Sequence, residues 1–343
     1  MKIIKKYEII KKVNSGGQGS IYKIKYKNII YALKIEKILE NEIKKNYKSI
    51  YWREIEFAQT MNKKYPINQT GKASLIEYPD LFMTLYDHDI IKDYNFTLDN
   101  PYNIERIKTL NNSIYCFRKI YEYIDITLDK IIDKIKVNEL YSIIIQLLYI
   151  IYIMNKNGYT HNDLHMLNIG VKKTSKKYIT IFDNKIPTNG YLIKVIDYGS
   201  ILHKKYILGN CELIGIDESQ ILLDNKTKEI RRILDIVFEL SFYNNISMNF
   251  WKKYNYEKEL ERFIKSKNSK LVNNLVENVY DKYTLFMLLY PEKAQKRLLK
   301  SNFTKTIDNK IRLPIEDIIF LFNATHIKSY NDIKKIIFYF INK

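Results

Sequence analysis

The chain has 343 residues, and its 57 Lys and Arg against 38 Asp and Glu give a formal net charge of +19. Hydrophobic residues make up 46% of the chain and aromatic residues 14%, which is enough to bury a core and excludes a disordered basic tail. Cys116 and Cys211 are far apart, without histidines at ligand spacing. This excludes a disulfide-rich secreted scaffold and a cysteine-based zinc site, and it favours a reducing compartment.

Residues 1–7 contain no long apolar stretch, so no secretory signal is predicted. The most apolar run, Ile143–Met154, carries Gln146 and is shorter than the roughly 20 residues needed to cross a bilayer. We therefore expect a buried helix at this run and no transmembrane segment. The protein is expected to be soluble and intracellular.

The positive charge has two interpretations. It can mark a partner such as nucleic acid, an anionic membrane surface or an acidic substrate. The lysines, however, interleave with acidic residues, as in residues 34–42, and form no block of five or six. Abundant Lys, Ile, Asn and Tyr are also typical of an AT-rich genome. Nucleic acid is therefore not expected to be the primary partner.

Three segments near the N-terminus alternate apolar and polar positions, and they cover residues 7–10, 21–26 and 29–35. Residues 14–19 and 27–28 separate them, so the pattern predicts three antiparallel strands joined by turns. Helical spacing of apolar residues then predicts a helix over residues 46–62.

The rest of the chain changes character from strands to helices. Residues 75–121 are predicted as strands around an irregular polar insertion at about residues 87–112. Helices are predicted over 128–132 and 137–156, strands over 169–196 with a turn near residue 183, and mainly helices beyond about residue 230. These elements predict an α+β protein with two lobes, a small β-rich one (residues 1–124) and a larger helical one (residues 125–343).

Two features with possible chemistry lie in the predicted strands. Gly16, Gly17 and Gly19 occupy the turn between the first two strands, where glycines let backbone N–H groups approach phosphate oxygens. An ordinary hairpin has the same composition, so this turn alone is a weak signal. Lys34 ends the third strand, where a lysine is more often an exposed edge residue.

Two further features are more specific. Asp163 is followed five residues later by Asn168, after a predicted buried helix and before a predicted strand. The Asp163 carboxylate can then contact a substrate hydroxyl, while the Asn168 amide coordinates a metal on the same side. An apolar strand ends in Asp197, Tyr198 and Gly199, where the carboxylate can bind Mg²⁺. In this order, the four features are poorly explained by loop structure alone.

With these features, residues 7–240 resemble the eukaryotic-type protein kinase superfamily. The resemblance implies a bilobal protein-kinase-like fold, ATP and Mg²⁺ (or Mn²⁺) as cofactors, and transfer of the γ-phosphate to Ser or Thr hydroxyls of a protein substrate. It implies that Asp163 is the catalytic base and that Lys34 holds the α- and β-phosphates. It further implies that Glu54 pairs with Lys34, and that Asn168 and Asp197 bind the metal.

The resemblance also implies a set of ATP-binding residues. Asn14 stands in the place of the first glycine of the loop, Tyr121 stands in the gatekeeper place, and Glu122–Ile124 resembles the adenine-contacting hinge. Glu56 is a weaker partner for the lysine than Glu54, because it lies on a different face of the helix. The implied ATP-binding residues are Asn14, Gly16, Gly17, Gly19, Ile21, Ala32, Lys34, Glu54, Tyr121, Glu122 and Ile124.

Some positions depart from the family pattern. Asn162 stands where many kinases have Arg, so activity is not expected to require phosphorylation of the activation loop. His165 replaces the lysine that touches the γ-phosphate, and no Ala-Pro-Glu closes the activation segment. Residues 163–165, the long hairpin before Asp197 and residues 196–198 are similar to haspin, and residues 187–199 are similar to Ser/Thr kinases of large DNA viruses (poxvirus and giant-virus type). A viral kinase is favoured, in the host cytoplasm or the virion, and the charge suits an acidic substrate.

Two alternatives stay open. A small-molecule phosphotransferase of the aminoglycoside or choline kinase type also uses His-x-Asp followed by Asn, and often carries His at the position of His165. The 38 residues from Asp197 to Asp235, matched to the helix Asp that supports the catalytic loop, favour a protein kinase. A pseudokinase scaffold would lack transfer, although all four polar positions are filled. No oligomeric state is predicted.

Overall fold

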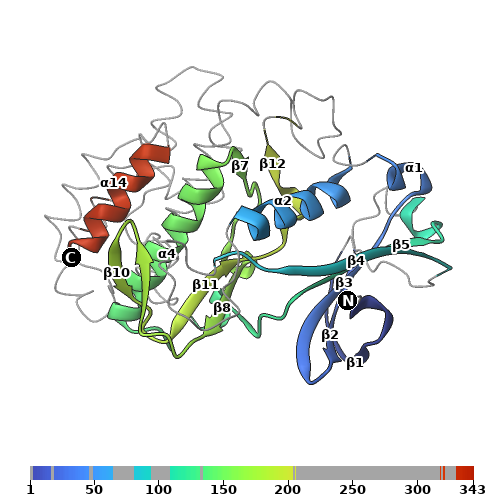
Figure 1. The fold of residues 1–343 in the computed structure, drawn as a ribbon, viewed down its shortest axis with the longest axis horizontal. Helices are drawn as coiled ribbons and strands as arrows, with labels where there is room; N and C mark the ends of the chain where they lie inside the picture. The colour runs from blue at the N-terminus through green and yellow to red at the C-terminus, as the bar shows by residue number, and fades with distance from the viewer. Residues whose placement is uncertain are drawn as a thin grey trace, which may run out of the picture.

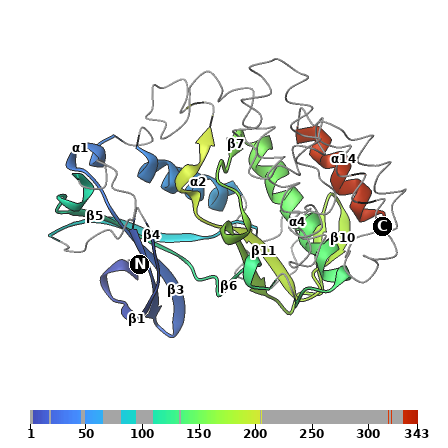
Figure 2. The same ribbon diagram turned by 180° about the vertical axis from the view of Figure 1, so that it is seen from behind.

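The computed structural model describes residues 3–16, 19–45, 49–64, 81–93, 109–131, 134–203, 205, 317, 320 and 330–343. Over these residues the protein is α+β, as predicted, with antiparallel sheets and helices packed beside them. The largest sheet and the last described helix lie at opposite ends of the part of the chain that the structure describes (Figures 1 and 2).

A five-stranded antiparallel sheet contains the N-terminal segments, and the three strands predicted there are confirmed. Its strands, in the spatial order β1-β2-β3-β5-β4, are β1 (Glu8–Gly16), β2 (Gly19–Tyr26), β3 (Ile29–Lys37), β5 (Tyr115–Glu122) and β4 (Leu85–Lys92). Lys27 and Asn28 connect β2 to β3 and both have positive φ, as a tight hairpin turn requires. Because β3 lies between β2 and β5, it is an interior strand of the sheet and not an edge strand.

The predicted insertion at residues 87–112 is wrong at its beginning, because residues 87–92 belong to β4 and pair with β5. Asp87 and Asp89 made this strand look like a loop, but each has a specific partner. Asp87 Oδ2 accepts a hydrogen bond from the backbone N of Ile4 (3.1 Å), and Asp89 binds Arg118 through both oxygens (2.8 and 2.6 Å). Residues 94–108 lie outside the described residues.

Helix α2 (Ile50–Lys64) corresponds to the helix predicted over residues 46–62 and follows the short helix α1 (Glu40–Ile43). Its buried face includes Glu54, Phe57 and Met61. The ring of Phe57 packs against Tyr198, with 4.6 Å between the centroids. α2 therefore connects the large sheet to the segment that contains Asp197.

Helix α4 (Val137–Lys156) is the buried helix predicted over residues 137–156, and it packs against α14 (Tyr330–Ile341). The apolar run was expected to be too short to cross a bilayer, yet α4 has 20 residues and is apolar enough to do so by length and composition. Most of its side chains are buried inside the protein, as in the core helix of a folded domain. It is the one such helix in the part of the chain that the structure describes.

The described residues also form three smaller antiparallel sheets, and two of them confirm the strands predicted over residues 169–196. They are β11-β8-β6, β9-β10 and β7-β12, formed by β6 (Ile126–Thr127), β7 (Tyr159–Thr160), β8 (Ile169–Lys173), β9 (Tyr178–Ile181), β10 (Asn184–Pro187), β11 (Tyr191–Val195) and β12 (Leu202–His203). Where a helix was predicted over 128–132, the described residues 128–131 form the 3₁₀ turn η3 (Leu128–Lys130), and residue 132 lies outside the described residues. Asp235 lies outside the described residues.

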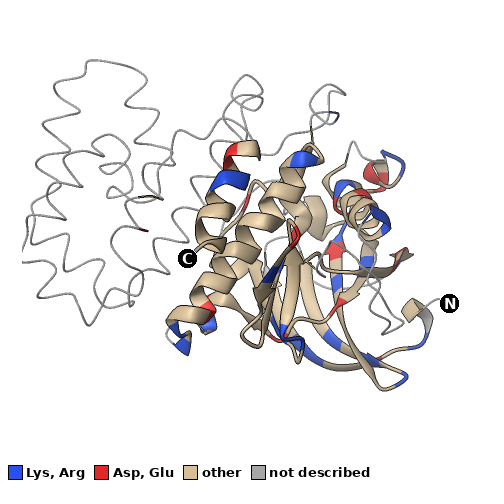
Figure 3. Cartoon of the chain, turned by 60° about the vertical axis from the view of Figure 1, so that its left-hand side comes forward, with Lys and Arg blue, Asp and Glu red and all other residues tan. Residues whose placement is uncertain are grey.

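The remaining short elements are 3₁₀ turns, η1 (Ile3–Lys5), η5 (Met166–Asn168) and η6 (Tyr198–Ser200). Among the described residues, Lys and Arg are distributed over several strands and helix ends and not along one element, while α4 carries few charges (Figure 3). Asn168 lies in η5, and Asp197 immediately precedes η6.

Candidate active site

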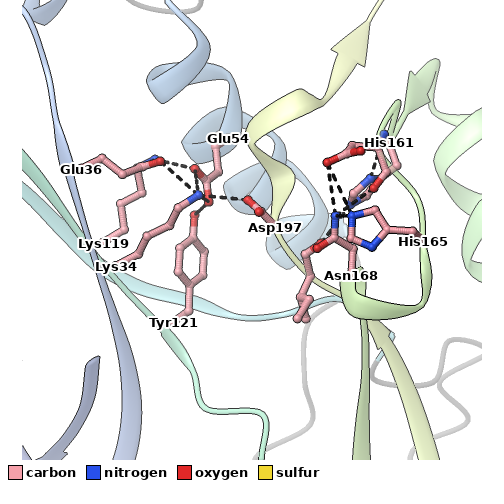
Figure 4. Close-up of polar contacts among 11 residues, drawn as sticks. Lys34, Glu36, Glu54, Lys119, Tyr121, His161, His165, Asn168 and Asp197 are labelled. Atoms are coloured by element: carbon pink, nitrogen blue, oxygen red, sulfur yellow. Dashed lines mark hydrogen bonds and ion pairs between the residues drawn. The ribbon is translucent and has the colours of Figure 1, made fainter. Parts of the chain in front are cut away.

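Three carboxylates from three separate segments meet the ammonium group of Lys34 (Figure 4). The Nζ atom lies 3.0 Å from Asp197 Oδ1, 3.2 Å from Glu54 Oε2 and 3.2 Å from Glu36 Oε1. Lys34 and Glu36 lie two residues apart on β3, so both side chains project from the same face of the sheet. Of the two glutamates of α2 considered from the sequence, Glu54 is thus the one that meets Lys34, whereas Glu56 pairs with Lys205.

Lys34 and Asp197 are both charged near neutral pH. The positive charge of Lys34 lowers the pKa of Asp197 from its usual 3.8 to about 2. Burial lowers the pKa of Lys34, but the charges of Asp197, Glu36 and Glu54 outweigh burial and raise this pKa well above 10.5. These opposite shifts mean that the charges of Lys34 and Asp197 stabilise each other.

Asp197 is held in an unusual backbone conformation. Its φ of 59° and ψ of 77° lie in the left-handed region, which is strained for a residue with a side chain. The next residue, Tyr198, is fully buried, and its hydroxyl accepts a hydrogen bond from the backbone N of Met83 (2.9 Å) and donates one to the carbonyl O of Val195 (2.8 Å). Tyr198 therefore anchors the turn that presents Asp197 to Lys34.

The turn η5 brings Asp163 and Asn168 together. The Asn168 amide nitrogen donates to the Asp163 backbone O (2.8 Å) and lies 3.4 Å from its carboxylate Oδ2. The same nitrogen lies 3.0 Å from His165 Nε2. Since the nitrogen faces these three acceptors, the amide oxygen is the atom of Asn168 that can bind a cation. The Asp163 side chain is 48% exposed, so a substrate can reach it.

His161 connects this turn to the strand that leads to Asp197. Its Nε2 lies 3.0 Å from the carbonyl O of Ile196, and its Nδ1 accepts a hydrogen bond from the backbone N of Asp163 (3.3 Å). Both contacts are satisfied by a neutral ring protonated on Nε2, and burial lowers the pKa of His161 accordingly. The backbone N of Ile196 also donates to Asn168 O (2.9 Å). Asp163, Asn168 and Asp197 are therefore fixed relative to one another.

These residues fit a magnesium ion better than a transition metal. Among the described residues, no group of three His, Cys, Asp or Glu side chains could hold a metal by itself. Mg²⁺ needs less from the protein, since it is usually bound by one or two carboxylates together with substrate phosphates. Asp197 and the amide oxygen of Asn168 supply oxygen ligands of this kind.

The glycine-rich turn is only partly described. Gly16 and Gly19 are paired in the β1–β2 register, whereas Gly17 lies outside the described residues. A Cβ at Gly19 would lie 2.2 Å from Ile35 O and 2.8 Å from Glu36 Cγ, so the packing of β2 on β3 already requires glycine there. The adjacent Asn14 accepts a hydrogen bond from the backbone N of Ser15 (2.9 Å) through its side chain.

The sheet register aligns other expected ATP-binding residues. Ile21 is paired with Lys34 between β2 and β3, and Ala32 is paired with Tyr121 between β3 and β5. The Tyr121 hydroxyl donates to Glu54 Oε1 (2.9 Å), so this residue joins the ion cluster.

Glu122 and Ile124 have structural partners that the sequence did not indicate. The Glu122 carboxylate binds Lys194 and Lys172, each at 2.5 Å. Burial raises the pKa of Glu122, but these lysines outweigh burial and lower it. Ile124 packs closely on Gly170, where an added Cβ would lie 2.7 Å from Ile124 Cγ2. The Glu122 side chain is thus held by ion pairs with residues of strands β8 and β11.

Sequence reasoning missed two residues of the ion cluster, Glu36 and Lys119. For Glu36 one signal was available, since charged residues at alternate positions of an otherwise apolar strand indicate an internal ion pair as well as a solvent face. No protein-family model matches the chain, and no curated protein matches it. Function must therefore be argued from the geometry.

Proposed function

We propose that the chain is an ATP-dependent protein kinase, which transfers the γ-phosphate to Ser or Thr hydroxyls and has the bilobal protein-kinase-like fold. The proposal depends chiefly on one observation, the meeting of Lys34 with Glu54 and Asp197 at 3.2 and 3.0 Å. These residues come from β3, α2 and the turn after β11, and all three match kinase positions in the sequence. The small lobe would contain the five-stranded sheet, and the large lobe α4 and α14.

In this proposal, the chain acts mainly by positioning and by charge. The ammonium of Lys34, oriented by Glu54, would bind the α- and β-phosphate oxygens. Bound Mg²⁺, held by Asp197 and the amide oxygen of Asn168, would neutralise charge that develops on the phosphate oxygens. Backbone N–H groups of residues 16–19 would cover the phosphates.

Asp163 would orient the acceptor hydroxyl and take its proton. The hydroxyl oxygen forms a bond to the γ-phosphorus while the bond from that phosphorus to the β-γ bridging oxygen breaks, and ADP leaves. Two contacts support this role, because Asn168 Nδ2 binds the Asp163 backbone O and neutral His161 binds its backbone N. The carboxylate is thereby held in place while still half exposed.

A small-molecule phosphotransferase is the second candidate, and the position of His165 favours it. This side chain contacts the Asn168 amide and is 46% exposed beside Asp163, where many protein kinases have lysine. Such a site would phosphorylate an aminoglycoside or choline by the same chemistry.

Transfer from γ-labelled ATP, measured with Mg²⁺ and the full chain, distinguishes the candidates. We expect labelling of proteins in a panel of acidic and basic substrates, and loss of labelling in Asp163→Asn. Labelling of aminoglycosides or choline alone would favour the second candidate. ATP binding without transfer to any acceptor would instead identify a pseudokinase scaffold.

A further inference from the structure

A second lysine, Lys119, lies beside Lys34 in the ion cluster. It is on β5, directly paired with Lys34 in the β3–β5 register, and it is fully buried. Its Nζ lies 2.5 Å from Glu36 Oε2 and 2.5 Å from Glu54 Oε2 (Figure 4). It is buried too completely to touch a substrate, so any role in the proposed reaction must act through its neighbours.

The two glutamates bridge the two lysines. Glu36 binds Lys34 through Oε1 (3.2 Å) and Lys119 through Oε2. Glu54 Oε2 is closer to Lys119 (2.5 Å) than to Lys34 (3.2 Å), and its Oε1 accepts from Tyr121. Strand β5 therefore holds Glu54 through two short contacts, while Lys34 is more loosely bound and also reaches Asp197.

The charges of the cluster show why a second lysine is needed. Lys34 and Lys119 supply two positive charges, while Glu36, Glu54 and Asp197 supply three negative ones, which leaves a net charge of −1. Both glutamates are 1% exposed, and a buried carboxylate without a positive partner is strongly destabilised. Burial raises the pKa of Glu54, yet Lys119 and then Lys34 outweigh burial and lower it.

We propose that Lys119 is a positioning residue that fixes Glu54 and Glu36, and so directs the ammonium of Lys34 toward Asp197 and the phosphates of a bound nucleotide. This inference rests on the proposed function, because Lys34 is assigned there to the phosphates. It assigns the orientation of Lys34 to two glutamates and a second lysine, and not to Glu54 alone.

The test uses the double variant Glu36→Gln/Lys119→Met. Lys119→Met alone would leave two buried glutamates with one lysine, and it is expected to impair folding. The double variant removes one charge of each sign and keeps the net charge of −1, but Glu54 loses its contact with β5 through Lys119. Asp89→Asn/Arg118→Met is the matched control, since it removes the ion pair of the neighbouring residue in β5 with the same change in charge.

Calorimetric titration with ADP plus Mg²⁺ and with adenosine separates positioning from structure, because only ADP carries the phosphates that Lys34 would bind. In the double variant we expect affinity for ADP to fall about tenfold, the scale of one hydrogen bond to a charged group, with adenosine affinity unchanged. The control variant should change neither affinity.

Two results would overturn the inference alone: unchanged ADP affinity in the double variant, or equal weakening of ADP and adenosine. If the wild-type chain binds neither ligand, the proposed function fails and the inference fails with it.

Discussion

Tyr198→Phe removes a single oxygen atom from the turn that presents Asp197. The Tyr198 hydroxyl accepts from the backbone N of Met83 (2.9 Å) and donates to Val195 O (2.8 Å), and Tyr198 is fully buried. The aromatic ring keeps its contact with Phe57, at 4.6 Å between centroids, so the variant creates no large cavity.

The expected loss of stability follows from these two bonds. A buried N–H group without its acceptor costs about 1–3 kcal/mol, and a lost neutral hydrogen bond costs about 0.5–1.5 kcal/mol. Together they predict that the free energy of unfolding falls by about 1.5–4.5 kcal/mol. The strained φ of Asp197 should relax as well, since the turn loses its anchor.

Urea denaturation followed by circular dichroism measures this change. The slope of the unfolding free energy against urea concentration should be the same in the variant and the wild type, so that their stabilities can be compared directly. Tyr178→Phe is the control, because Tyr178 is 57% exposed on β9. Its effect should stay within about 0.5 kcal/mol. A loss below about 0.5 kcal/mol for Tyr198→Phe would refute the role given to the buried hydroxyl.

Three further predictions follow from the site. Gly19→Ala should lower the thermal unfolding midpoint, because its Cβ would lie 2.2 Å from Ile35 O. An unchanged midpoint would contradict this, since β2 would then shift away from β3 without loss of stability. Asp163→Asn should reduce γ-phosphate transfer by about 10²–10⁴-fold. It should leave the unfolding midpoint nearly unchanged, because the side chain is 48% exposed; equal transfer rates would contradict its role as base. Acid titration should also report on Asp197, whose pKa is lowered from 3.8 to about 2 by Lys34. Because its pKa is lower in the folded state, the ionised carboxylate stabilises the fold above pH 4. This stabilisation, about 1 kcal/mol after allowance for exposure, is lost as the pH falls toward 2. Asp197→Asn should flatten that part of the stability curve, and an unchanged curve would contradict the ion pair.

The strands of the large sheet were predictable where polar and apolar residues alternate cleanly, as in residues 21–26. β4 was not, because Asp87 and Asp89 resemble loop residues until their partners Ile4 and Arg118 are known. Those partners lie far away in the sequence, and only the tertiary fold brings them to the strand.

The candidate site shows the same limit. Lys34, Glu54 and Asp197 could be predicted because each lies in a short local motif, and these motifs follow one another along the chain in a recognisable order. Lys119 belongs to no such pattern, and its position opposite Lys34 depends on the β3–β5 register, which joins residues 85 positions apart (119 − 34 = 85). A lysine within a strand is ordinarily a solvent residue, so only this pairing reveals its burial.

The most direct test of the account is the rate at which the purified chain transfers γ-phosphate from Mg²⁺-ATP to protein hydroxyls, with the modified residues identified by mass spectrometry. The account predicts phosphoserine or phosphothreonine on protein substrates with the wild-type chain. With Asp163→Asn it predicts transfer at least about a hundredfold slower, which is the lower limit of the effect expected for loss of a general base. Absence of protein phosphorylation by the wild-type chain, under conditions in which it binds ATP, would contradict it.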